Sequence, residues 1–377
     1  MPLSGAACDA PLSGAAVIDS ALSQTLAQFQ GAFLALPSAR HPRWLLPMDA
    51  AGGRVPGGLE IYTPYTPMAR LGKLATQTLL RAGWRGRRRD RVLLTARQPL
   101  ALEKLVAEIT GEPRPMFALA LGTAGRYRKL TAQAMRPDGE ILGYLKFPLT
   151  AAAGARIRHE AAMLEGLWQY AELRPHLPRV LHAGLWEDGY LLFQSSGPAE
   201  AAGVEFGPAH EAFLRRLAAA RRTGQAGERI VERTAERWRA VAPRLSAGWR
   251  ELGSETLRRA AAGLRGAPVD CGIGHGDFAP WNTRAAGGRL FVYDWEAADW
   301  DAPLGWDGFH FDVQVASLLG RRGHRLPPPQ RAPLPRARAS FWLYLLHSAC
   351  LGMEEQSPAC PGVDFRRQLL TTELRCS

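Results

Sequence analysis

The most constraining stretch of the sequence is residues 273–300, "IGHGDFAPWNTRAAGGRLFVYDWEAADW". After Asn282, two runs of strand-forming residues flank a glycine pair, a pattern that predicts a β-hairpin. Because a hairpin returns the chain to its start, we expect Asp294 to come back beside Asn282. The segment "FAPW" between Asp277 and Asn282 holds a proline and two aromatics, which predicts a rigid loop rather than a helix.

The polar residues of this stretch suggest two separate chemical roles, metal binding and proton acceptance. Oxygen atoms of Asn282 and Asp294 that converge on one point are suitable ligands for magnesium, a hard cation that prefers oxygen. Asp277 would then be free to accept a proton from a substrate hydroxyl. His275 could be a general base, but directly before Gly-Asp we favour a role in holding the loop by hydrogen bonds.

Residues 113–196 carry a second group of candidate site residues. In "LGTAGRYRKL", Gly122 and Gly125 lie at a bend between two strands, where backbone N–H groups can approach an anion, although two glycines are also typical of a plain turn. Lys146 lies in the apolar strand "GYLKFP". In the helix predicted over 151–169, Glu160 shares a face with apolar residues. A buried carboxylate needs a cation, and Lys146 is the nearest candidate; the alternative leaves Glu160 in water at the edge of that face.

The order of predicted elements suggests two lobes with a cleft between them. Small residues and a repeated "PLSGAA" predict a mobile tail over residues 1–35. Residues 36–112 form an α/β extension with no recognisable chemical motif. Residues 113–196 read as a small β-rich lobe, and amphipathic periodicity predicts a larger helical lobe over 197–377. Ligands usually bind in such clefts.

The net positive charge of the chain is compatible with an anionic partner but does not require one. The net charge is +12 over 377 residues, and most of the excess is arginine scattered through predicted helices, as on a solvated surface. The densest run, "RAGWRGRRRDR" at 81–91, follows a predicted helix that ends at Gly83. A bare arginine run is typical of a solvated turn, while contact with acidic lipid or nucleic acid through 81–91 is the alternative.

Several features favour a cytoplasmic protein. No apolar run approaches the roughly 20 residues that cross a bilayer, and the first residues lack the basic and apolar regions of a signal peptide. The five cysteines form no C-x-x-C pair and are odd in number. The sequence therefore predicts neither a disulfide framework nor a zinc site, and a reduced compartment.

Taken together, these residues resemble the aminoglycoside phosphotransferase and choline kinase-like enzymes, which have the protein-kinase fold. His275, Gly276, Asp277 and Asn282 match the family pattern H-G-D-x-x-x-x-N, and "DWE" at 294–296 matches the segment that follows it. The resemblance implies a bilobal α+β protein-kinase-like fold, with ATP or another nucleoside triphosphate and magnesium as cofactors and a small-molecule hydroxyl as acceptor. The loop "GTAG" lacks a third glycine and departs from the protein-kinase form.

The resemblance also implies a role for each matched position. It makes Asp277 the base, Asn282 and Asp294 the magnesium ligands, Lys146 the phosphate-binding lysine and Glu160 its partner, with Gly122 and Gly125 in the phosphate loop and His275, Glu296 and Asp307 in support. Asp307, in "PLGWDGFHF", corresponds to an acidic residue that braces the catalytic loop.

The acceptor is the least constrained part of the prediction. From Glu205 to Arg259 there are seven glutamates against twelve arginines, a basic balance that suits a polycationic drug poorly and favours a neutral or anionic sugar-like compound. Asp299, Asp301 and Glu296 are the counter-evidence, since they could hold an amine. Two other classes stay open: an inactive kinase-like scaffold that binds nucleotide or a partner protein, and a membrane- or nucleic-acid-associated protein that uses its N-terminal segment.

Overall fold

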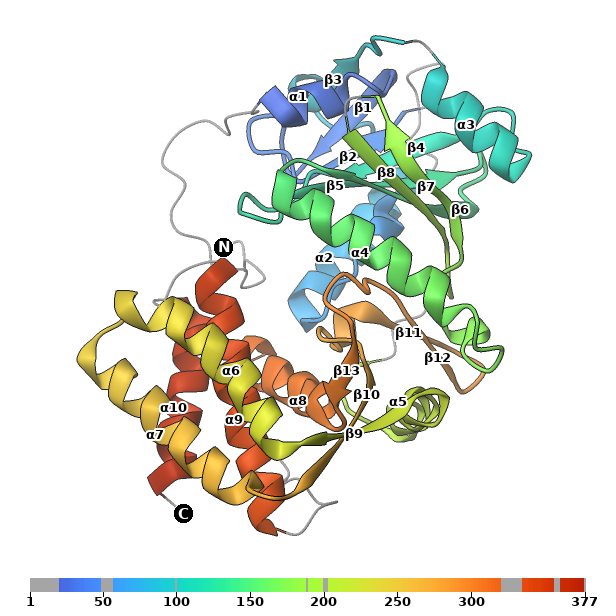
Figure 1. Ribbon diagram of the computed structural model, residues 1–377. Helices are drawn as coiled ribbons and strands as arrows, with labels where there is room; N and C mark the ends of the chain where they lie inside the picture. Colours follow the sequence, from blue (N-terminus) through green and yellow to red (C-terminus); the bar gives the residue numbers. More distant parts are fainter. Residues whose placement is uncertain are drawn as a thin grey trace.

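The computed structural model describes residues 20–48, 57–98, 100–187, 189–198, 203–319, 334–355 and 360–375. The chain forms two lobes, a β-rich N-lobe and a mainly helical C-lobe (Figure 1). This confirms the predicted α+β bilobal architecture.

The N-lobe is built on one eight-stranded antiparallel sheet in the order β3-β1-β2-β4-β5-β6-β8-β7. In that order the strands are Arg91–Leu94, Gly31–Leu36, Trp44–Pro47, Met116–Ala120, Lys129–Met135, Ile141–Pro148, Gly189–Ser195 and Val180–Trp186. The turn between β5 and β6 contains Gly139 at φ 96°, a left-handed conformation that glycine adopts without strain.

Alternation along the strands divides the sheet into two faces. Leu130, Ala132 and Ala134 of β5 belong to a core shared with α1 (Ser20–Leu26) and α3 (Ala101–Thr110). On the opposite face α4 (Ala151–Leu167) packs against β8 and presents Glu160 toward β6. α2 (Pro67–Arg81), drawn in light blue below the sheet in Figure 1, reaches this face through Leu80.

The predicted mobile tail over 1–35 differs from the structure between residues 20 and 35. This segment forms α1 and most of β1, and Leu22, Phe29 and Phe33 are buried in the N-lobe core. The small-residue repeat ends at residue 16, and the apolar residues that follow can bury a face, which a tail cannot do. Residues 1–19 lie outside the described residues. The extension over 36–112 shares the N-lobe sheet, because β2 pairs with β4.

The C-lobe combines six helices in the described ranges with two small sheets. The helices are α5 (Pro208–Ala220), α6 (Gly227–Val241), α7 (Ala247–Leu264), α8 (Trp306–Leu319), α9 (Leu334–Glu355) and α10 (Pro361–Arg375). β9 (Arg222–Ala226), β10 (Pro268–Gly274) and β13 (Asp299–Pro303) form a three-stranded sheet in the order β13-β10-β9. The second sheet is the hairpin β11 (Thr283–Ala286) and β12 (Arg289–Val292). Its last pair is Ala286 with Arg289, so the glycine pair at 287–288 forms the turn, as predicted.

Two further findings bear on the compartment predictions. None of the helices in the described part of the chain combines the length and apolarity that a bilayer crossing requires. Cys271 and Cys350 are buried free thiols, whereas Cys360 is disulfide-bonded. The absence of close cysteine pairs in the sequence gave no signal for that bond.

Candidate active site

The loop after β10 is held by buried hydrogen bonds. The backbone N–H groups of His275 and Gly276 donate to the two carboxylate oxygens of Asp307, at 2.8 and 3.0 Å. Gly276 has φ 78°, and a Cβ there would lie 2.2 Å from the carbonyl oxygen of Ala297. The position therefore requires glycine, and Asp307 holds the loop in the way expected of a bracing residue.

His275 acts on the same loop from the other side. Its Nδ1 accepts from the backbone N–H of Asp277 at 3.2 Å, and its Nε2 donates to the carbonyl of Tyr293 at 3.1 Å. Burial lowers the pKa of His275, so the imidazole is neutral near pH 7 and both bonds are made. These are the loop-holding bonds that we favoured for His275 over a role as base.

Each carboxylate oxygen of Asp277 has a hydrogen-bond partner. Asn282 Nδ2 donates to Oδ2 at 2.9 Å and to the Asp277 backbone carbonyl at 2.8 Å. His310 Nε2 lies 2.9 Å from Oδ1. The Asp277 side chain is nevertheless 36% exposed and lines a large cavity, so it can meet a substrate from the cleft.

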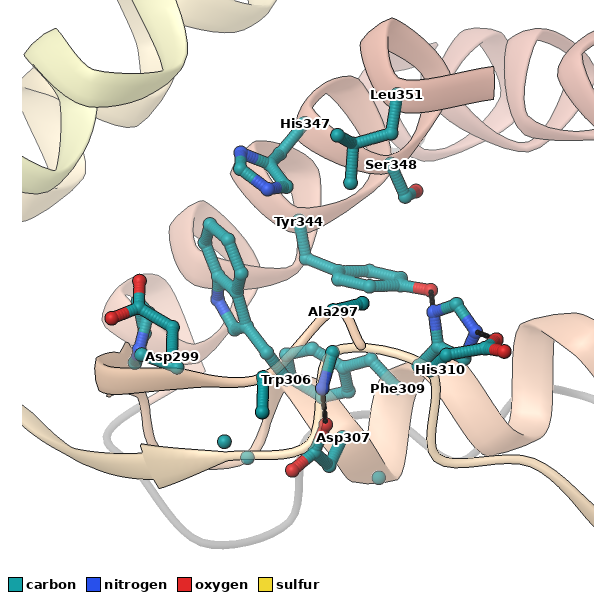
Figure 2. Close-up of a pocket in the computed structure, with 18 of the residues that line it drawn as sticks. Ala297, Asp299, Trp306, Asp307, Phe309, His310, Tyr344, His347, Ser348 and Leu351 are labelled. Carbon is teal, nitrogen blue, oxygen red and sulfur yellow. Dashed lines mark hydrogen bonds and ion pairs between the residues drawn. The ribbon is translucent and has the colours of Figure 1, made fainter. Parts of the chain in front are cut away.

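His310 is a site residue that the sequence reasoning missed. It lies on α8, and its Nδ1 is 3.2 Å from the hydroxyl of Tyr344 on α9 (Figure 2). Burial raises the pKa of Tyr344 to about 12, so the hydroxyl keeps its proton and can donate it to Nδ1. This leaves Nε2 protonated to donate to Asp277. The signal was available, because His310 follows Asp307 by three positions, on the same helix face.

The predicted ion pair between Lys146 and Glu160 is confirmed. Lys146 Nζ lies 2.6 and 2.7 Å from the two carboxylate oxygens of Glu160 and 2.7 Å from Asp294 Oδ1. Glu160 also accepts from the backbone N–H of Trp295 at 3.3 Å. Burial raises the pKa of Glu160, whose side chain is fully enclosed, so the adjacent ammonium group is what keeps a charged carboxylate tolerable there.

Lys129 is the second site residue that sequence reasoning missed. Its Nζ lies 2.9 Å from Asp294 Oδ1 and 2.5 Å from Glu296 Oε2. Burial alone would lower the pKa of Lys129, but the two carboxylates raise it well above its usual value. Burial alone would raise the pKa of Asp294, yet the ammonium groups of Lys129 and Lys146 hold it far below its usual range. At neutral pH Lys129 and Asp294 are therefore both charged.

The backbone at Asp294 is itself unusual. Its φ of 70° lies in the left-handed region, which costs a non-glycine residue on the order of 1 kcal/mol. The strained turn directs the carboxylate from the end of the hairpin toward the lysines of the N-lobe. Strain of this kind is concentrated at functional sites, which supports a role for Asp294 beyond packing.

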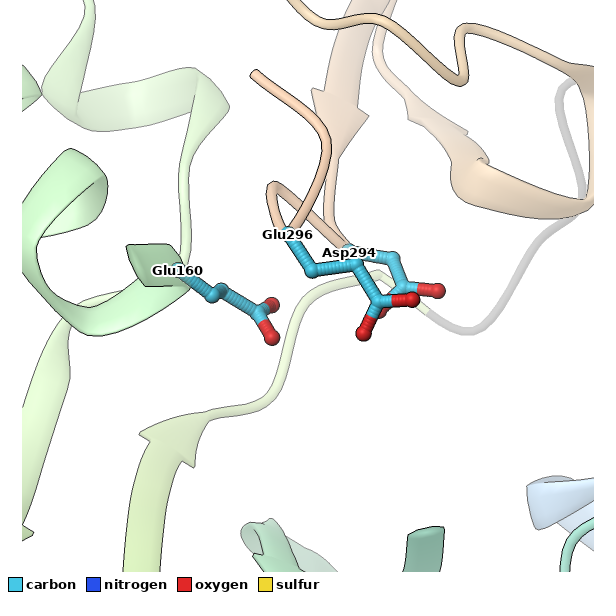
Figure 3. Close-up of side chains that lie close together, drawn as sticks. All are labelled: Glu160, Asp294 and Glu296. Carbon is cyan, nitrogen blue, oxygen red and sulfur yellow. The ribbon is translucent and has the colours of Figure 1, made fainter. Parts of the chain in front are cut away.

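An oxygen cluster suited to a cation is present where the two lobes meet. Carboxylate oxygens of Glu160, Asp294 and Glu296 lie within 4.8 Å of one another (Figure 3). An all-oxygen donor set fits a hard divalent cation. The amide nitrogen of Asn282, the other predicted ligand, is turned to Asp277 instead. Because the ammonium of Lys129 contacts Asp294 and Glu296, a metal ion at these oxygens must displace it.

The glycine loop lies between β4 and β5, directly before Lys129. Gly122 has φ 66°, and a Cβ there would lie 2.2 Å from the carbonyl oxygen of Lys129, so the bend depends on glycine. Gly125 has φ 156° and open space around its Cα. The loop thus brings backbone close to the start of the strand that carries Lys129.

A cavity of about 1600 Å³ opens beside Asp277. Aromatic side chains contribute to its wall, and Figure 2 shows Trp306, Tyr344 and His347 grouped on one side of it. Most of the carboxylates that line the cavity are paired with arginines, among them Asp299 with Arg233, Glu354 with Arg237, and Glu296 and Glu355 with Arg156; Asp277 and Asp307 are held by other donors. The lining is therefore close to charge-balanced.

No protein-family model and no curated protein sequence matches this chain. Among solved structures, a thermostable mutant of the aminoglycoside phosphotransferase APH(4)-Ia, in ternary complex with AMP-PNP and hygromycin B, matches with a TM-score of 0.50 and 15% identity. The match covers 73% of this chain and 98% of that chain. The chain has the fold of an aminoglycoside phosphotransferase. The GDP complex of wild-type aminoglycoside 2'-phosphotransferase-IIIa matches at a TM-score of 0.46 and 12% identity, over 74% of this chain and 98% of that one.

Proposed function

We propose that this protein is an ATP- and magnesium-dependent phosphotransferase that transfers the γ-phosphate to a hydroxyl of a small molecule. One observation carries the proposal: the hairpin β11–β12 joins two different carboxylates. Asp277, before the hairpin, faces the cavity, and Asp294, after it, contacts Lys146. The acceptor side and the phosphate side of a transfer reaction are thereby set a fixed distance apart.

On the phosphate side, Lys146 is the group that binds the α- and β-phosphates. Its ammonium is oriented by two contacts with Glu160, so little side-chain freedom is lost when phosphate arrives. Backbone N–H groups around Gly122 and Gly125 can approach the phosphates because these positions carry no Cβ. ATP as donor fits the cytoplasm that the sequence predicts.

Asp294, Glu296 and the side-chain oxygen of Asn282 would hold the magnesium. Bound there, it would neutralise charge on the transferring phosphate. The proximity of the Asp294 and Glu296 oxygens supports this assignment, and Lys129, which contacts both side chains, would have to leave them. Phosphate oxygens on the nucleotide would give the ammonium of Lys129 a new anionic partner.

On the acceptor side, Asp277 accepts the proton of the attacking hydroxyl. The hydroxyl oxygen forms its bond to the γ-phosphorus as the bond to the leaving ADP oxygen breaks. Asn282 and His310 each donate to Asp277, which fixes the orientation of its carboxylate. General-base assistance by Asp277 thus aids a transfer that depends mainly on positioning.

The acceptor that fits this cavity best is a neutral or anionic sugar-like compound. A polycation needs free carboxylates, but Asp299 is bonded to Arg233, Asp301 to Arg221, and Glu296 to Lys129. The three acidic residues that argued for an amine substrate in the sequence thus have cationic partners. The half-buried side chains of Trp300 and Trp306 in the cavity wall offer flat apolar surface to the C–H face of a sugar ring.

An inactive scaffold is the second candidate. It has no need of both metal ligands and a positioned base, whereas this chain keeps Asp277, Asn282, Asp294, Lys146 and Glu160. The test is an ATP-consumption screen with magnesium across sugars, sugar phosphates, choline-like amines and aminoglycosides. Turnover with a sugar-like acceptor is expected. Turnover with an aminoglycoside at micromolar concentration would overturn the acceptor class, and no turnover together with nucleotide binding would favour the scaffold.

A further inference from the structure

Helix α2 is amphipathic, but its polar face packs against the protein and its apolar face is exposed to solvent. The residues that face the body of the protein recur at i, i+4, i+7, i+8 and i+11 and are mainly polar; they are Ala69, Lys73, Thr76, Gln77 and Leu80. Only Leu80 of this 15-residue helix is buried. The apolar residues lie on the other side and face solvent. A surface helix of a globular domain has the opposite arrangement, so α2 has an apolar face without a partner in the described structure.

Polar contacts hold α2 in this orientation. Lys73 Nζ donates to the carbonyl of Tyr62 at 2.7 Å, and Gln77 Nε2 donates to Glu60 Oε1 at 3.1 Å. Thr66 caps the helix by accepting from the backbone N–H of Ala69. Rotating α2 to bury its leucines would break these bonds. The exposure of the apolar face is therefore a property of the fold.

The exposed face is substantial. Met68, Leu71, Leu74 and Leu79 are 61%, 60%, 57% and 50% exposed, and they account for half of the large exposed hydrophobic side chains in the described residues. Trp84, just after the helix, is 39% exposed. Apolar side chains gathered on one helix face mark an interaction surface, whereas single exposed leucines are ordinary.

An arginine-rich segment follows the same helix. Arg81, Arg85, Arg87, Arg88, Arg89 and Arg91 are all exposed. A helix with an apolar face and a dense positive charge at its end matches the two properties of an anionic bilayer surface, an apolar layer beneath negative headgroups. We propose that α2 and residues 81–91 dock the protein on an anionic lipid surface, with Met68, Leu71, Leu74 and Leu79 entering the headgroup region.

Other occupants match only part of this surface. In a symmetric dimer with two antiparallel α2 helices the apolar faces would cover each other, but the arginine runs would lie at opposite ends without an anionic partner. Nucleic acid would satisfy the arginines but leave the leucines in water. An anionic lipid surface can bind both the apolar face of α2 and the arginines that follow it. Docking in this way does not depend on the proposed phosphotransferase activity and would place the cavity of an active enzyme near membrane-bound acceptors.

The test uses the full chain and sucrose-loaded vesicles, either of neutral phosphatidylcholine or with about one third phosphatidylserine. We expect sedimentation with the anionic vesicles, weakened by salt. Combined L71S, L74S and L79S should lower the partition coefficient about 100-fold. Combined R85Q, R87Q and R88Q should lower it by a similar factor, since each arginine near such a surface contributes about five-fold.

Matched controls use residues of the same types elsewhere on the surface. Leu185→Ser removes a leucine that is 88% exposed in the strand β7, and combined R216Q, R265Q and R289Q removes three exposed arginines distant in sequence. Both controls should bind like the wild type, and all variants should keep the wild-type thermal midpoint because the changed side chains are exposed.

Three results would overturn the proposal. Equal binding to neutral and anionic vesicles would remove the role of charge, and undiminished binding by the leucine variant would remove the role of α2. If the wild type ignored both vesicles but formed dimers that the leucine variant lost, α2 would be a contact between copies. None of these readouts involves catalysis, so failure here and failure of the proposed activity are separate outcomes.

Discussion

The carboxylates before and after the hairpin differ in their surroundings. Asp294 contacts two ammonium groups, Lys129 and Lys146, and has a strongly depressed pKa. Asp277 instead receives hydrogen bonds from an amide and an imidazole and is partly open to the cavity. One environment suits a permanent anion that holds cations, and the other suits an anion that can take up a proton.

This contrast shows how one hairpin can serve two kinds of chemistry. Charged partners at Asp294 come from the N-lobe strands β5 and β6, so the proposed phosphate side depends on contact between lobes. The partners of Asp277 come from the C-lobe alone. A change on the phosphate side should therefore alter cation and nucleotide binding, and a change on the acceptor side should alter turnover.

The largest expected effect is on turnover. Asp277→Asn keeps the size of the side chain but removes the proton acceptor, so kcat should fall about 1000-fold while nucleotide affinity stays within a factor of two. Asp138→Asn, in the exposed turn between β5 and β6, is the control and should leave kcat unchanged. Turnover near the wild-type rate in Asp277→Asn would remove the base assignment.

The two lysines of the phosphate side should respond differently. Lys146→Met leaves the buried Glu160 without its cationic partner and removes the phosphate contact. Nucleotide binding should therefore weaken about 100-fold. Lys129→Met removes the ammonium that a metal ion must displace. Its metal-free form should melt about 3 °C lower, while the stabilisation by magnesium alone should increase.

Thermal melting with and without magnesium checks the lysine prediction, and Lys129→Arg is the matched variant that keeps the charge. If magnesium stabilised Lys129→Met less than the wild type, Lys129 would not compete with a cation for Asp294 and Glu296.

A smaller effect is expected from His310. His310→Phe removes one donor to Asp277, which should lower kcat about 10-fold with little change in KM for the acceptor. His310→Gln can still donate and should recover part of the rate. The measurement is steady-state kinetics at one pH, with kcat and the KM for the acceptor compared among the wild type and the two variants. Equal kcat values for the two variants would mean that the hydrogen bond has no positioning role.

The smallest predicted effect is a pH dependence of stability. Burial, with Arg237 and Arg233 nearby, lowers the pKa of His347 to about 3. The folded protein thus disfavours the proton that the unfolded chain binds near pH 6.5, so this stability is complete above pH 6.5 and declines as the pH falls toward 3. His347→Gln removes that dependence. Its melting temperature relative to the wild type should rise by about 2 °C from pH 7.5 to pH 5.5, and a constant difference would contradict this.

Local features in the sequence predicted the hairpin and its neighbours well. The glycine pair set the turn, and the helix face that carries Glu160 predicted its pair with Lys146. Lys129 was missed because its partner Asp294 is 165 positions away in sequence and no local pattern marks it. For His310 the spacing of three positions from Asp307 was a usable signal, but its partner Asp277 lies 33 positions away, outside the helix. The direction of the Asn282 amide depends on the same long-range packing.

The N-terminal region shows the limits of sequence patterns most clearly. Leucines at helical spacing predicted α2, but the pattern could not say which face would meet the protein. Hydrogen bonds to Tyr62 and Glu60 decide that orientation, and they form only when the segment before the helix lies against the sheet. The small strands β9, β10 and β13 were likewise invisible, since their stability comes from pairing over long distances in sequence.

The most direct test of the central claim is the thermal shift produced by AMP-PNP with magnesium in three proteins. The account predicts the same stabilisation for the wild type and Asp277→Asn, and little or none for Asp294→Asn, because only Asp294 belongs to the phosphate side. Without magnesium the shift should shrink in the first two proteins. No shift in the wild type, or equal shifts in Asp294→Asn and the wild type, would contradict the assignment of this cleft to a magnesium-bound nucleotide.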